Sequence, residues 1–318
     1  MAKVTINHVF SNDVPSQIFD DLMRRFEGAG HRFTHLKSVQ PLAGALVRHY
    51  HRPNLESRLI RPAVVTVHHD LSETDEWLQF RKFERQYREA DLIICLNTSQ
   101  IEFLKAEGIP HTTLIPHGYD AALLGPVRRV FDGVRKISIG VFSRRYPRKV
   151  KGEAHLHELM KRLDPDKFKF LFIGQDRSVD ARQARLRGFE VRSYENVPYC
   201  VLASAYREID ILLIASAFEG GPASIPEAVA TATPVISTPV GMANDYVTEG
   251  VTGHFLRLIP TEDACLLSRL HANPVELERL FDGARQRADS ATEWSSIVAR
   301  HEDAYQTIIR SAVGPYEQ

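Results

Sequence analysis

Residues 209–238 of the chain read IDILLIASAFEGGPASIPEAVATATPVIST. The stretch begins and ends with short, almost continuously apolar runs, 209–215 and 233–238, which are typical of buried parallel β-strands. Between these runs lie a glycine-containing turn at 219–222 and a helical segment at 225–232. A strand, a helix and a second strand in this order predict a right-handed crossover unit of an α/β sheet.

The same alternation extends over most of the chain. Further apolar runs predict strands at 4–10, 63–69, 92–96, 112–116, 137–142, 168–174 and 189–194. Amphipathic segments predict helices at 17–28, 76–89, 99–107, 154–163, 199–207 and 294–310. The fold class is therefore α/β, with two Rossmann-like domains that we expect to face each other across a cleft.

A loop-rich segment at 116–135, in which proline, glycine and charged residues cluster, separates the two halves of the pattern. A new strand follows it at Ile137. We therefore predict an N-terminal domain at 1–130 and a C-terminal domain at 131–318.

Composition excludes several classes of protein. The 318 residues include 40 Lys+Arg and 40 Asp+Glu, and 43% are hydrophobic, so collagen-like, disordered and disulfide-scaffold proteins are excluded. The three cysteines have no paired spacing, which predicts a reduced compartment and no zinc cluster. The chain shows neither a secretory leader nor an apolar run of about 18–20 residues, so we expect a soluble, cytoplasmic protein, with peripheral membrane contact left open.

The turn at 219–222 carries the most informative chemistry. Glu219 follows the strand, and Glu227 lies near the start of the helix. Gly220 and Gly221 allow a ligand to approach the backbone closely, and the helix N-terminus favours an anion. The pattern predicts a site for a compound with phosphate and hydroxyl groups; helix-capping acids around a tight turn are the structural alternative.

A strongly basic loop, SRRYPRKVKGE at 143–153, follows the first strand of the C-terminal half. Arginine offers a planar fork to two phosphate oxygens, and lysine offers a compact point charge. Such cations stabilise the negative charge on a departing diphosphate without a metal ion. A solvated basic loop is the alternative interpretation.

Residues 216–253, with the trailing PVISTPVG and EGVTG, resemble the C-terminal signature of the retaining GT-B glycosyltransferases of family 4 (glycosyl transferases group 1). Glu219 and Glu227 match the E-x7-E motif of that family. The resemblance is strong over about 137–310 and weak over 1–125, in a half that looks shorter than usual. It implies a GT-B fold, a C-terminal domain that binds a nucleotide sugar, and a last helix that crosses back to the N-terminal domain.

The resemblance also implies an activity: retaining, metal-independent transfer of a hexosyl or pentosyl group, with no cofactor. Glu219 would contact the donor sugar and Glu227 the nucleotide ribose. Arg145 and Lys151 match the basic pattern of the family at the diphosphate, with Arg144 and Lys149 as substitutes. The other donor-binding candidates, which lie around the sugar, diphosphate and base, are Gly220, Gly221, Ser224, Glu195 and Val197.

In the N-terminal half, VTVHHD at 65–70 places His68 and His69 at the end of a strand, where alternation turns one of them toward the cleft. By resemblance, we assign His69 to the reaction centre, and His68 and Asp70 to the acceptor side. The stretch SNDVPSQIF at 11–19 lacks the glycines that family members carry there, which leaves the acceptor unidentified.

The window 31–61 is rich in positive charge, with six Lys or Arg residues, four histidines and one Glu. Either it is a solvated face, or it binds an anionic acceptor through residues such as Arg48 and Arg52. Lipid-linked saccharides and polymer precursors fit the second interpretation, and nucleic acid is the least favoured. Protonation of the histidines would then strengthen acceptor binding toward about pH 6.

Three alternatives to a glycosyltransferase remain open at this stage: a GT-B sugar-nucleotide epimerase, a phosphorylase-like enzyme, and an inactive nucleotide-sugar-binding subunit. The one D-x-D triplet, at 164–166, is interpreted as a turn, and no metal ligands are predicted. The donor base, the donor sugar and the oligomeric state are not predicted.

Overall fold

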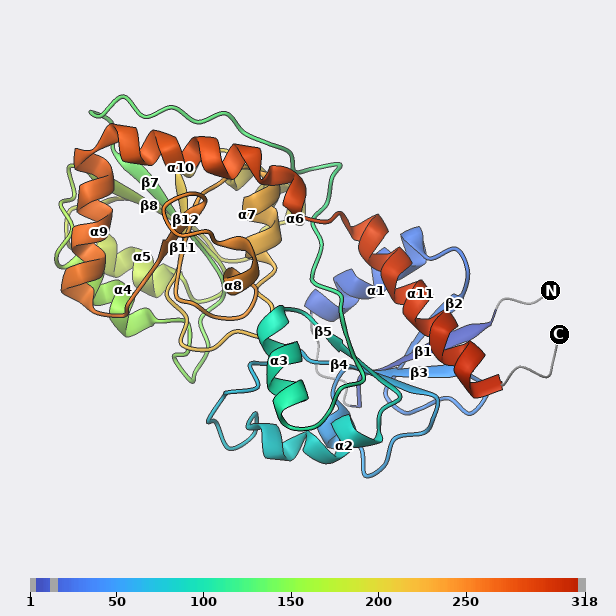
Figure 1. Cartoon of the computed structure of the whole chain (residues 1–318). Coiled ribbons are helices and arrows are strands. Elements are labelled where there is room, and N and C mark those ends of the chain that lie inside the picture. The colour runs from blue at the N-terminus through green and yellow to red at the C-terminus, as the bar shows by residue number, and fades with distance from the viewer. Residues whose placement is uncertain (1–3, 12–16, 314–318) are drawn as a thin grey trace. The chain divides into compact units, whose positions relative to one another are not determined.

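The computed structural model describes residues 4–11 and 17–313. The chain forms two compact units, each built on one six-stranded sheet (Figure 1). Unit 1 comprises residues 1–117 and 293–318, and unit 2 comprises residues 118–292. All paired strands of both sheets run parallel. The predicted α/β class with two Rossmann-like sheets is confirmed.

Unit 1 has the strand order β2-β1-β3-β4-β5-β6. Its strands are β1 (Thr5–Val9), β2 (Thr34–Ser38), β3 (Val47–Tyr50), β4 (Ala63–Thr66), β5 (Leu92–Cys95) and β6 (Thr112–Leu114). Its α-helices are α1 (Gln17–Ala29), α2 (Glu84–Glu89), α3 (Thr98–Ala106) and α11 (Trp294–Val313), with short 3-10 helices at Pro53–Leu55 and Phe80–Lys82.

Helices cover both faces of the unit 1 sheet. Val64 of β4 belongs to a core with residues of α1 and α11, whereas its neighbours Ala63 and Val65 belong to a core with residues of α2 and α3. This division follows from the alternation of side chains along a strand. The last helix, α11, packs beside α1, as Figure 1 shows.

Unit 2 has the strand order β12-β11-β10-β7-β8-β9. Its strands are β7 (Ile137–Phe142), β8 (Phe168–Ile173), β9 (Glu190–Tyr194), β10 (Ile211–Ile214), β11 (Val235–Ser237) and β12 (Gly253–Phe255). Its α-helices are α4 (Glu153–Met160), α5 (Ser178–Arg185), α6 (Tyr199–Ala205), α7 (Ser224–Ala230), α8 (Ala243–Tyr246), α9 (Pro260–Ala272) and α10 (Pro274–Gln286), with a 3-10 helix at Ala288–Ser290.

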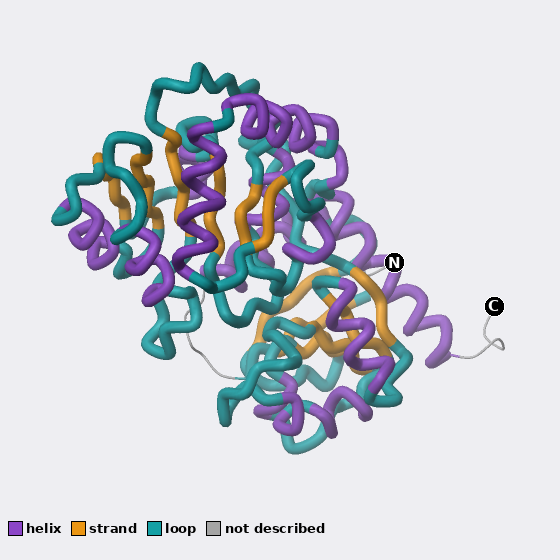
Figure 2. Tube along the Cα trace, turned by 60° about the vertical axis from the view of Figure 1, so that its left-hand side comes forward, coloured by secondary structure: helices purple, strands orange, loops and turns teal. Residues whose placement is uncertain are grey.

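Two cores again lie on opposite faces of the sheet of unit 2. One contains residues of α4, α5, α9 and α10, and the other contains residues of α6, α7 and α8. Within β10, Ile211 and Leu213 face the first core, and Leu212 and Ile214 face the second. Figure 2 shows the strands of each unit with helices on either side. Burial on both faces explains why the strands of this unit are nearly continuous apolar runs.

Three strands were not predicted: β2, β3 and β12. In β3, Arg48 and His49 are buried in a strand that contains only four residues. Their polar character hides the strand from a search for apolar runs. β12 contains only three residues, and β2 lies at the edge of its sheet.

The segment between the sheets belongs to unit 2 from Gly118 onward, whereas the sequence placed the boundary after residue 130. The backbone N–H of Val127 donates to Thr231 O at 3.1 Å. The buried guanidinium of Arg129 then donates to the carbonyl oxygens of Ile209 (2.8 Å), Thr231 (2.8 Å) and Ala232 (2.9 Å), and to those of Tyr206 and Val127. Arg129 therefore ties this segment to the ends of several elements.

No helix within 4–11 and 17–313 is both long and apolar enough to cross a membrane.

We expect Arg129→Met to lower the free energy of unfolding of unit 2 by about 3 kcal/mol or more, because several buried carbonyl groups lose their donor. Arg128→Met is the matched control, since Arg128 is exposed and adjacent in sequence. Chemical denaturation of both variants measures the difference. Equal stability of the two variants would show that Arg129 does not anchor the segment.

Candidate functional site

The strand order of unit 2 reverses between β7 and β10: β8 and β9 follow on one side, and β11 and β12 on the other. In open α/β sheets, ligands bind at such a point, outside the carboxyl ends of the strands. The basic loop 143–152 leaves β7, and the turn 215–223 leaves β10. The two segments that carry the predicted donor chemistry therefore start from neighbouring strands at this edge.

Lys151 and Glu219 are in direct contact at this edge. The Lys151 ammonium donates to Glu219 Oε1, and the Ser216 hydroxyl donates to the same oxygen at 2.7 Å. Both charged side chains are largely buried, with exposed fractions of 12% and 10%. The structure thus joins two of the residues that the sequence assigned to catalysis, and it adds Ser216, which the sequence analysis missed.

Two glycines with positive φ make this approach sterically feasible. Gly152 has a φ of 73°, and a Cβ there would overlap the carbonyl oxygen of Ala215. Gly241 has a φ of 50°, and a Cβ there would lie 2.7 Å from Glu219 O. Only glycine adopts such conformations without strain and also leaves room for the neighbouring backbone. The turn at 219–220 is therefore bordered by backbone from two other loops.

Glu227 lies in the first turn of α7 and is nearly buried, with 6% of its surface exposed. The hydroxyl of Tyr199 donates to its Oε1 and the hydroxyl of Tyr206 to its Oε2, both at 2.7 Å. Burial raises the pKa of Tyr206 well above its usual value, and the charge of Glu227 adds to the effect. Tyr206 thus remains a donor at neutral pH, and the two hydroxyl groups fix the orientation of the carboxylate.

Sequence reasoning missed these two tyrosines. They lie seven positions apart, and seven residues are close to two helical turns. This spacing places both on one face of α6 and its C-terminal end. The spacing was readable from the sequence, but the partner in α7 was not.

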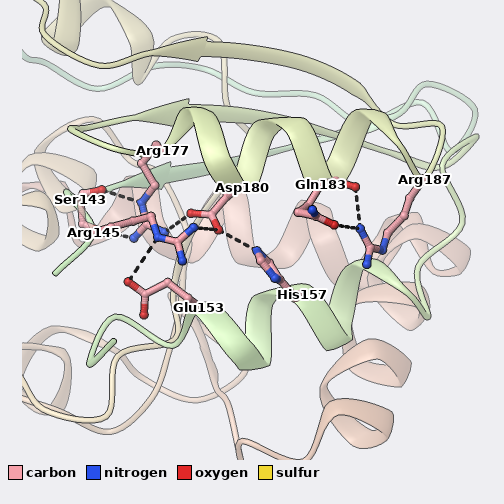
Figure 3. A network of polar contacts seen from close by, with 8 residues as sticks. All are labelled: Ser143, Arg145, Glu153, His157, Arg177, Asp180, Gln183 and Arg187. Carbon is pink, nitrogen blue, oxygen red and sulfur yellow. Dashed lines mark hydrogen bonds and ion pairs between the residues drawn. The ribbon is translucent and has the colours of Figure 1, made fainter. Parts of the chain in front are cut away.

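Arg145 is part of a buried ionic network, shown in Figure 3. Its guanidinium donates to Asp180 Oδ1 at 3.0 Å and lies 4.0 Å from Glu153 Oε1. Asp180 also accepts from Arg177 at 2.7 Å and from His157 at 2.8 Å. The position of Arg145 is therefore set by residues of α4 and α5 that carry no sequence signal for this role.

Asp180 is ionised within this network. Burial alone would raise the pKa of its carboxyl, but the hydrogen bonds from His157 and Arg177, with the nearby guanidinium charges, hold it below its usual value. Arg177, which is fully buried, also donates to the carbonyl and the hydroxyl of Ser143. The start of the basic loop is thus anchored to α5.

The other basic candidates of the loop lie nearer to solvent. Arg144 is exposed and stacks on Tyr146, with its guanidinium carbon 4.5 Å from the ring centroid. Lys149 is exposed and has a φ of 55°. Of the four candidate cations, Arg145 and Lys151 are therefore anchored, whereas Arg144 and Lys149 are exposed.

Three further donor-binding candidates lie at the same edge of unit 2. Glu195 follows β9, and its hydrogen bond with Ser178 lowers its pKa. Val197 packs against the core under α6 and α7. Ser224 is the first residue of α7, and its carbonyl accepts from Tyr206 at 3.2 Å.

In unit 1, the two histidines that follow β4 lie on opposite faces of the sheet, because successive side chains alternate between the faces. His69 stacks on Phe83 at 4.0 Å between ring centroids, its Nε2 is buried without a hydrogen-bond partner, and burial lowers its pKa to about 4. His68 lies on the other face, where its Nε2 is 3.0 Å from His51 Nδ1. The structure therefore places the partly exposed His69 against Phe83, just before α2, and His68 among further histidines.

The remaining acceptor-side candidates have local partners. Asp70 accepts from the backbone N–H and the hydroxyl of Ser72, at 2.9 and 2.6 Å. Arg48 is buried and donates to Leu42 O and Ala43 O. The guanidinium of Arg52 lies 5.5 Å from the ring centroid of Phe19, and burial lowers its pKa.

The expectation that histidines of the window 31–61 add positive charge near pH 6 is wrong for His49 and His51. His49 and His51 are buried in unit 1, and burial lowers the pKa of each well below its usual value. Most basic residues of the window also have partners: Arg32 pairs with Asp303, Lys37 with Asp20, Arg61 with Asp91, and Arg48 with carbonyl groups. Of the stretch 11–19, residues 12–16 lie outside the described residues.

Part of unit 2 is similar in sequence to known proteins. Residues 136–270, which lie within that unit, match the sequence model of the family described as Glycosyl transferases group 1. A curated relative, the MMP alpha-(1->4)-mannosyltransferase of Mycolicibacterium hassiacum, is 31% identical over 112 residues, which make up 34% of this chain. The match covers 27% of that relative, so the chain matches about a quarter of its length.

Solved structures show the same fold over nearly the whole chain. A sucrose-phosphate synthase from Thermosynechococcus elongatus superposes with a TM-score of 0.76 at 16% identity, and covers 96% of this chain and 99% of its own. HepE from Anabaena, solved in complex with UDP and glucose, gives a TM-score of 0.72 at 16% identity, over 96% and 100%. The fold is that of the GT-B glycosyltransferases.

The buried histidines predict how stability depends on pH. Burial lowers the pKa of His69, His117 and His301 to about 4, whereas an unfolded histidine titrates near 6.5. Between these values the unfolded chain binds more protons, so the free energy of unfolding should fall as pH drops from about 6.5 to about 4. The loss should be on the order of 1–3 kcal/mol per histidine.

Urea unfolding at several pH values between 7.5 and 4.5 measures this effect. His31→Gln is the control, because His31 is exposed and its removal should leave the slope unchanged. Constant stability across the window would contradict burial of these rings as neutral groups.

Proposed function

We propose that the protein is a glycosyltransferase that moves a sugar from a nucleoside-diphosphate sugar to a hydroxyl group of an acceptor. The contact between Lys151 and Glu219 is the observation that carries this proposal. In such a donor, the anomeric carbon is bonded to an oxygen of the distal phosphate. A cation for that phosphate and an acid for the sugar hydroxyls must therefore lie within a few ångström of each other. Lys151 and Glu219 meet this requirement at the switch point of unit 2.

The second acid fits the nucleotide part of the same donor. Glu227 belongs to the element that follows Glu219, and Tyr199 and Tyr206 hold its carboxylate in one orientation. A fixed carboxylate is a strong acceptor for hydroxyl groups such as those of a ribose. The family match over 136–270 includes both acids.

The proposed reaction retains the anomeric configuration. The bond from the anomeric carbon to the diphosphate oxygen breaks, and its electron pair stays on the diphosphate. The acceptor oxygen forms the new bond on the same face and loses its proton. Retention rests on the resemblance of Glu219 and Glu227 to the E-x7-E motif, and the anomeric configuration of an isolated product tests it.

Metal independence is part of the proposal. Lys151 and Arg145 supply positive charge where the diphosphate leaves. In other enzymes a divalent cation stabilises this negative charge. In the D-x-D triplet, Asp164 accepts from the backbone N–H of Asp166 at 2.9 Å, an arrangement typical of an aspartate turn.

For the acceptor we favour a saccharide, free or lipid-linked. Four basic residues of the window 31–61 are bound to acids or carbonyl groups within unit 1. Because these cations already have partners, we favour an acceptor that is recognised through its hydroxyl groups, and we disfavour a polyanion such as nucleic acid.

Nucleotide binding provides the direct test. UDP, GDP or ADP should raise the melting temperature, since a ligand that binds the folded state at about 100 times its Kd adds about 2.7 kcal/mol of stability. Lys151→Ala should abolish most of the shift relative to its own ligand-free baseline. Lys161→Ala, which removes an exposed lysine directly after α4, should retain it. If no nucleoside diphosphate shifts the wild type, or if Lys151→Ala responds fully, the donor site is wrong.

Chelation tests the role of the cations. Transfer or hydrolysis of the bound donor should continue at an unchanged rate in excess EDTA, because Lys151 and Arg145 provide the charge. Loss of activity that Mg²⁺ or Mn²⁺ restores would contradict the proposed mechanism. Arg145→Ala, assayed in parallel, should lower kcat/KM by roughly 10²-fold or more.

A further inference from the structure

Four histidines form a line across the sheet of unit 1. His35 lies on β2 and His8 on β1, while His51 directly follows β3 and His68 follows β4. His35 Nδ1 lies 3.0 Å from His8 Nε2, and His8 Nδ1 lies 3.1 Å from His51 Nε2. His51 Nδ1 in turn lies 3.0 Å from His68 Nε2. We call this line the imidazole chain.

The geometry of the sheet explains why the chain is continuous. β2, β1, β3 and β4 are neighbours in this order, and each contributes one ring, either from the strand itself or from the residues just after it. Neighbouring strands lie about 4.8 Å apart. The ring centroids are separated by 5.3, 5.4 and 5.3 Å, which is close to that spacing. An imidazole with a hydrogen bond on each side therefore bridges from one strand to the next.

The chain is buried under α1 and α11. His8 and His51 are almost fully buried, and burial, reinforced by neighbouring histidines, lowers the pKa of each well below its usual value. Burial likewise lowers the pKa of His68 to about 3. At neutral pH these rings are neutral. The titratable and charged groups that face the chain from other positions are His49, Tyr305, His301, His117, His69 and Arg52.

All three contacts have the same direction, from Nδ1 of one ring to Nε2 of the next. A neutral imidazole carries one N–H and one lone pair. The tautomer of any ring therefore fixes the tautomer of its neighbours. The whole chain has two fully bonded states: every ring protonated at Nε2, or every ring protonated at Nδ1.

A carboxylate at one end selects between these states. Glu302 of α11 is buried, and its Oε1 lies 3.6 Å from His35 Nε2. The same oxygen accepts from the backbone N–H of Arg32 at 3.0 Å. The distance of 3.6 Å to His35 is longer than a hydrogen bond, but a carboxylate offers acceptor oxygens only, so it favours the proton on Nε2 of His35 and hence on Nε2 of every ring.

The other end of the chain is His68 Nδ1, which then carries a lone pair. His68 is partly exposed and lies beyond the carboxyl end of β4, the edge at which ligands bind to open α/β sheets. Among residues 4–11 and 17–313, no hydrogen-bond partner of this nitrogen is found. A hydroxyl group of a ligand at this edge would find an acceptor there.

We propose that the imidazole chain is a proton relay that takes the proton of a substrate hydroxyl at His68 and delivers it to Glu302. The inference deepens the proposed glycosyl transfer, in which the acceptor hydroxyl must lose a proton. The proton binds His68 Nδ1, and each ring passes its Nε2 proton to the next ring, so that Glu302 becomes protonated. Four rings exchange one tautomer for the other, and the departing diphosphate keeps the electron pair of the broken bond. His68 acts on the substrate, and the other members are positioning residues.

A metal site is the competing interpretation of these histidines. Ligand atoms of His8, His49 and His51 lie within 4.8 Å of one another. However, His49 already bonds to Tyr305 at 2.7 Å and to Thr66 at 2.6 Å. Both nitrogens of His8 and His51 are engaged in the chain. A metal would have to displace these hydrogen bonds, whereas the relay uses them all.

The test observes the ring nitrogens directly by NMR of the intact protein labelled with ¹⁵N-histidine. At neutral pH, His35, His8, His51 and His68 should each show one protonated nitrogen, at Nε2. Glu302→Gln should convert this single tautomer into a mixture that extends to His68, because an amide both donates and accepts. Asp303→Asn is the matched control, since it removes an exposed acid from the adjacent position of α11 and should leave the tautomers unchanged.

A merely structural cluster would not transmit a change at Glu302 across three rings to His68. Mixed tautomers in the wild type, or an unchanged His68 in Glu302→Gln, would overturn the relay. So would one equivalent of zinc or another transition metal in the purified protein. His8→Phe keeps an aromatic ring next to Phe26 and interrupts the imidazole chain, so His68 should then show a mixture of both tautomers. This variant provides the test if Glu302→Gln folds poorly.

Kinetics connect the relay to the proposed function. Glu302→Gln should lower kcat for transfer at least about tenfold, with donor and acceptor KM unchanged and with the nucleotide-induced thermal shift intact. Thr66→Val, which removes a hydrogen bond of His49 outside the chain, should leave kcat near that of the wild type. An unchanged kcat in Glu302→Gln would overturn the catalytic role. Absence of any nucleotide binding would instead refute the glycosyltransferase, and the NMR result would still decide whether the chain exists.

Discussion

The close approach of Gly152 to the end of β10 determines the geometry of unit 2. Because this residue lies against the carbonyl of Ala215 with a φ of 73°, no side chain can be accommodated there. The loop after β7 is therefore held directly on the end of the neighbouring strand. Lys151, one position earlier, is thereby brought to Glu219. Steric contact between backbones, rather than attraction between charges, decides where this ion pair forms.

The parallel sheets could be predicted because burial on both faces makes strands such as 137–142 and 209–215 continuously apolar. The same argument fails where strands bury polar groups. In β3, the buried Arg48 donates to carbonyl groups of Leu42 and Ala43, and His49 bonds to the hydroxyl of Thr66 and the phenol of Tyr305, which is distant in sequence. A buried polar side chain with distant partners resembles a surface residue when only its neighbours in sequence are known. The window 31–61 therefore looked like a uniformly charged face, although His35, Arg48, His49 and His51 are buried.

The candidate site shows the same division between local and distant information. The spacing of Glu219 and Glu227 is local, and the turn and helix between them follow from residues 209–238. Their partners are not local: Tyr199 lies 28 positions from Glu227, and Lys151 lies 68 positions from Glu219. The network that holds Arg145 depends on Asp180, which is 35 positions away. Sequence reasoning could name the charged groups but not the contacts that orient them.

The two units satisfy buried polar groups by different means. In unit 2, cations are paired with acids, as in Lys151 with Glu219, and such a cation keeps a partner when a phosphate oxygen replaces the carboxylate. In unit 1, the buried imidazoles of the imidazole chain form hydrogen bonds with one another. Most of their nitrogen atoms therefore have a partner although the rings carry no charge. A paired cation is suited to a leaving group that gains negative charge. A neutral imidazole chain is suited to a group that releases a proton, because the rings can take up that proton by exchanging tautomers.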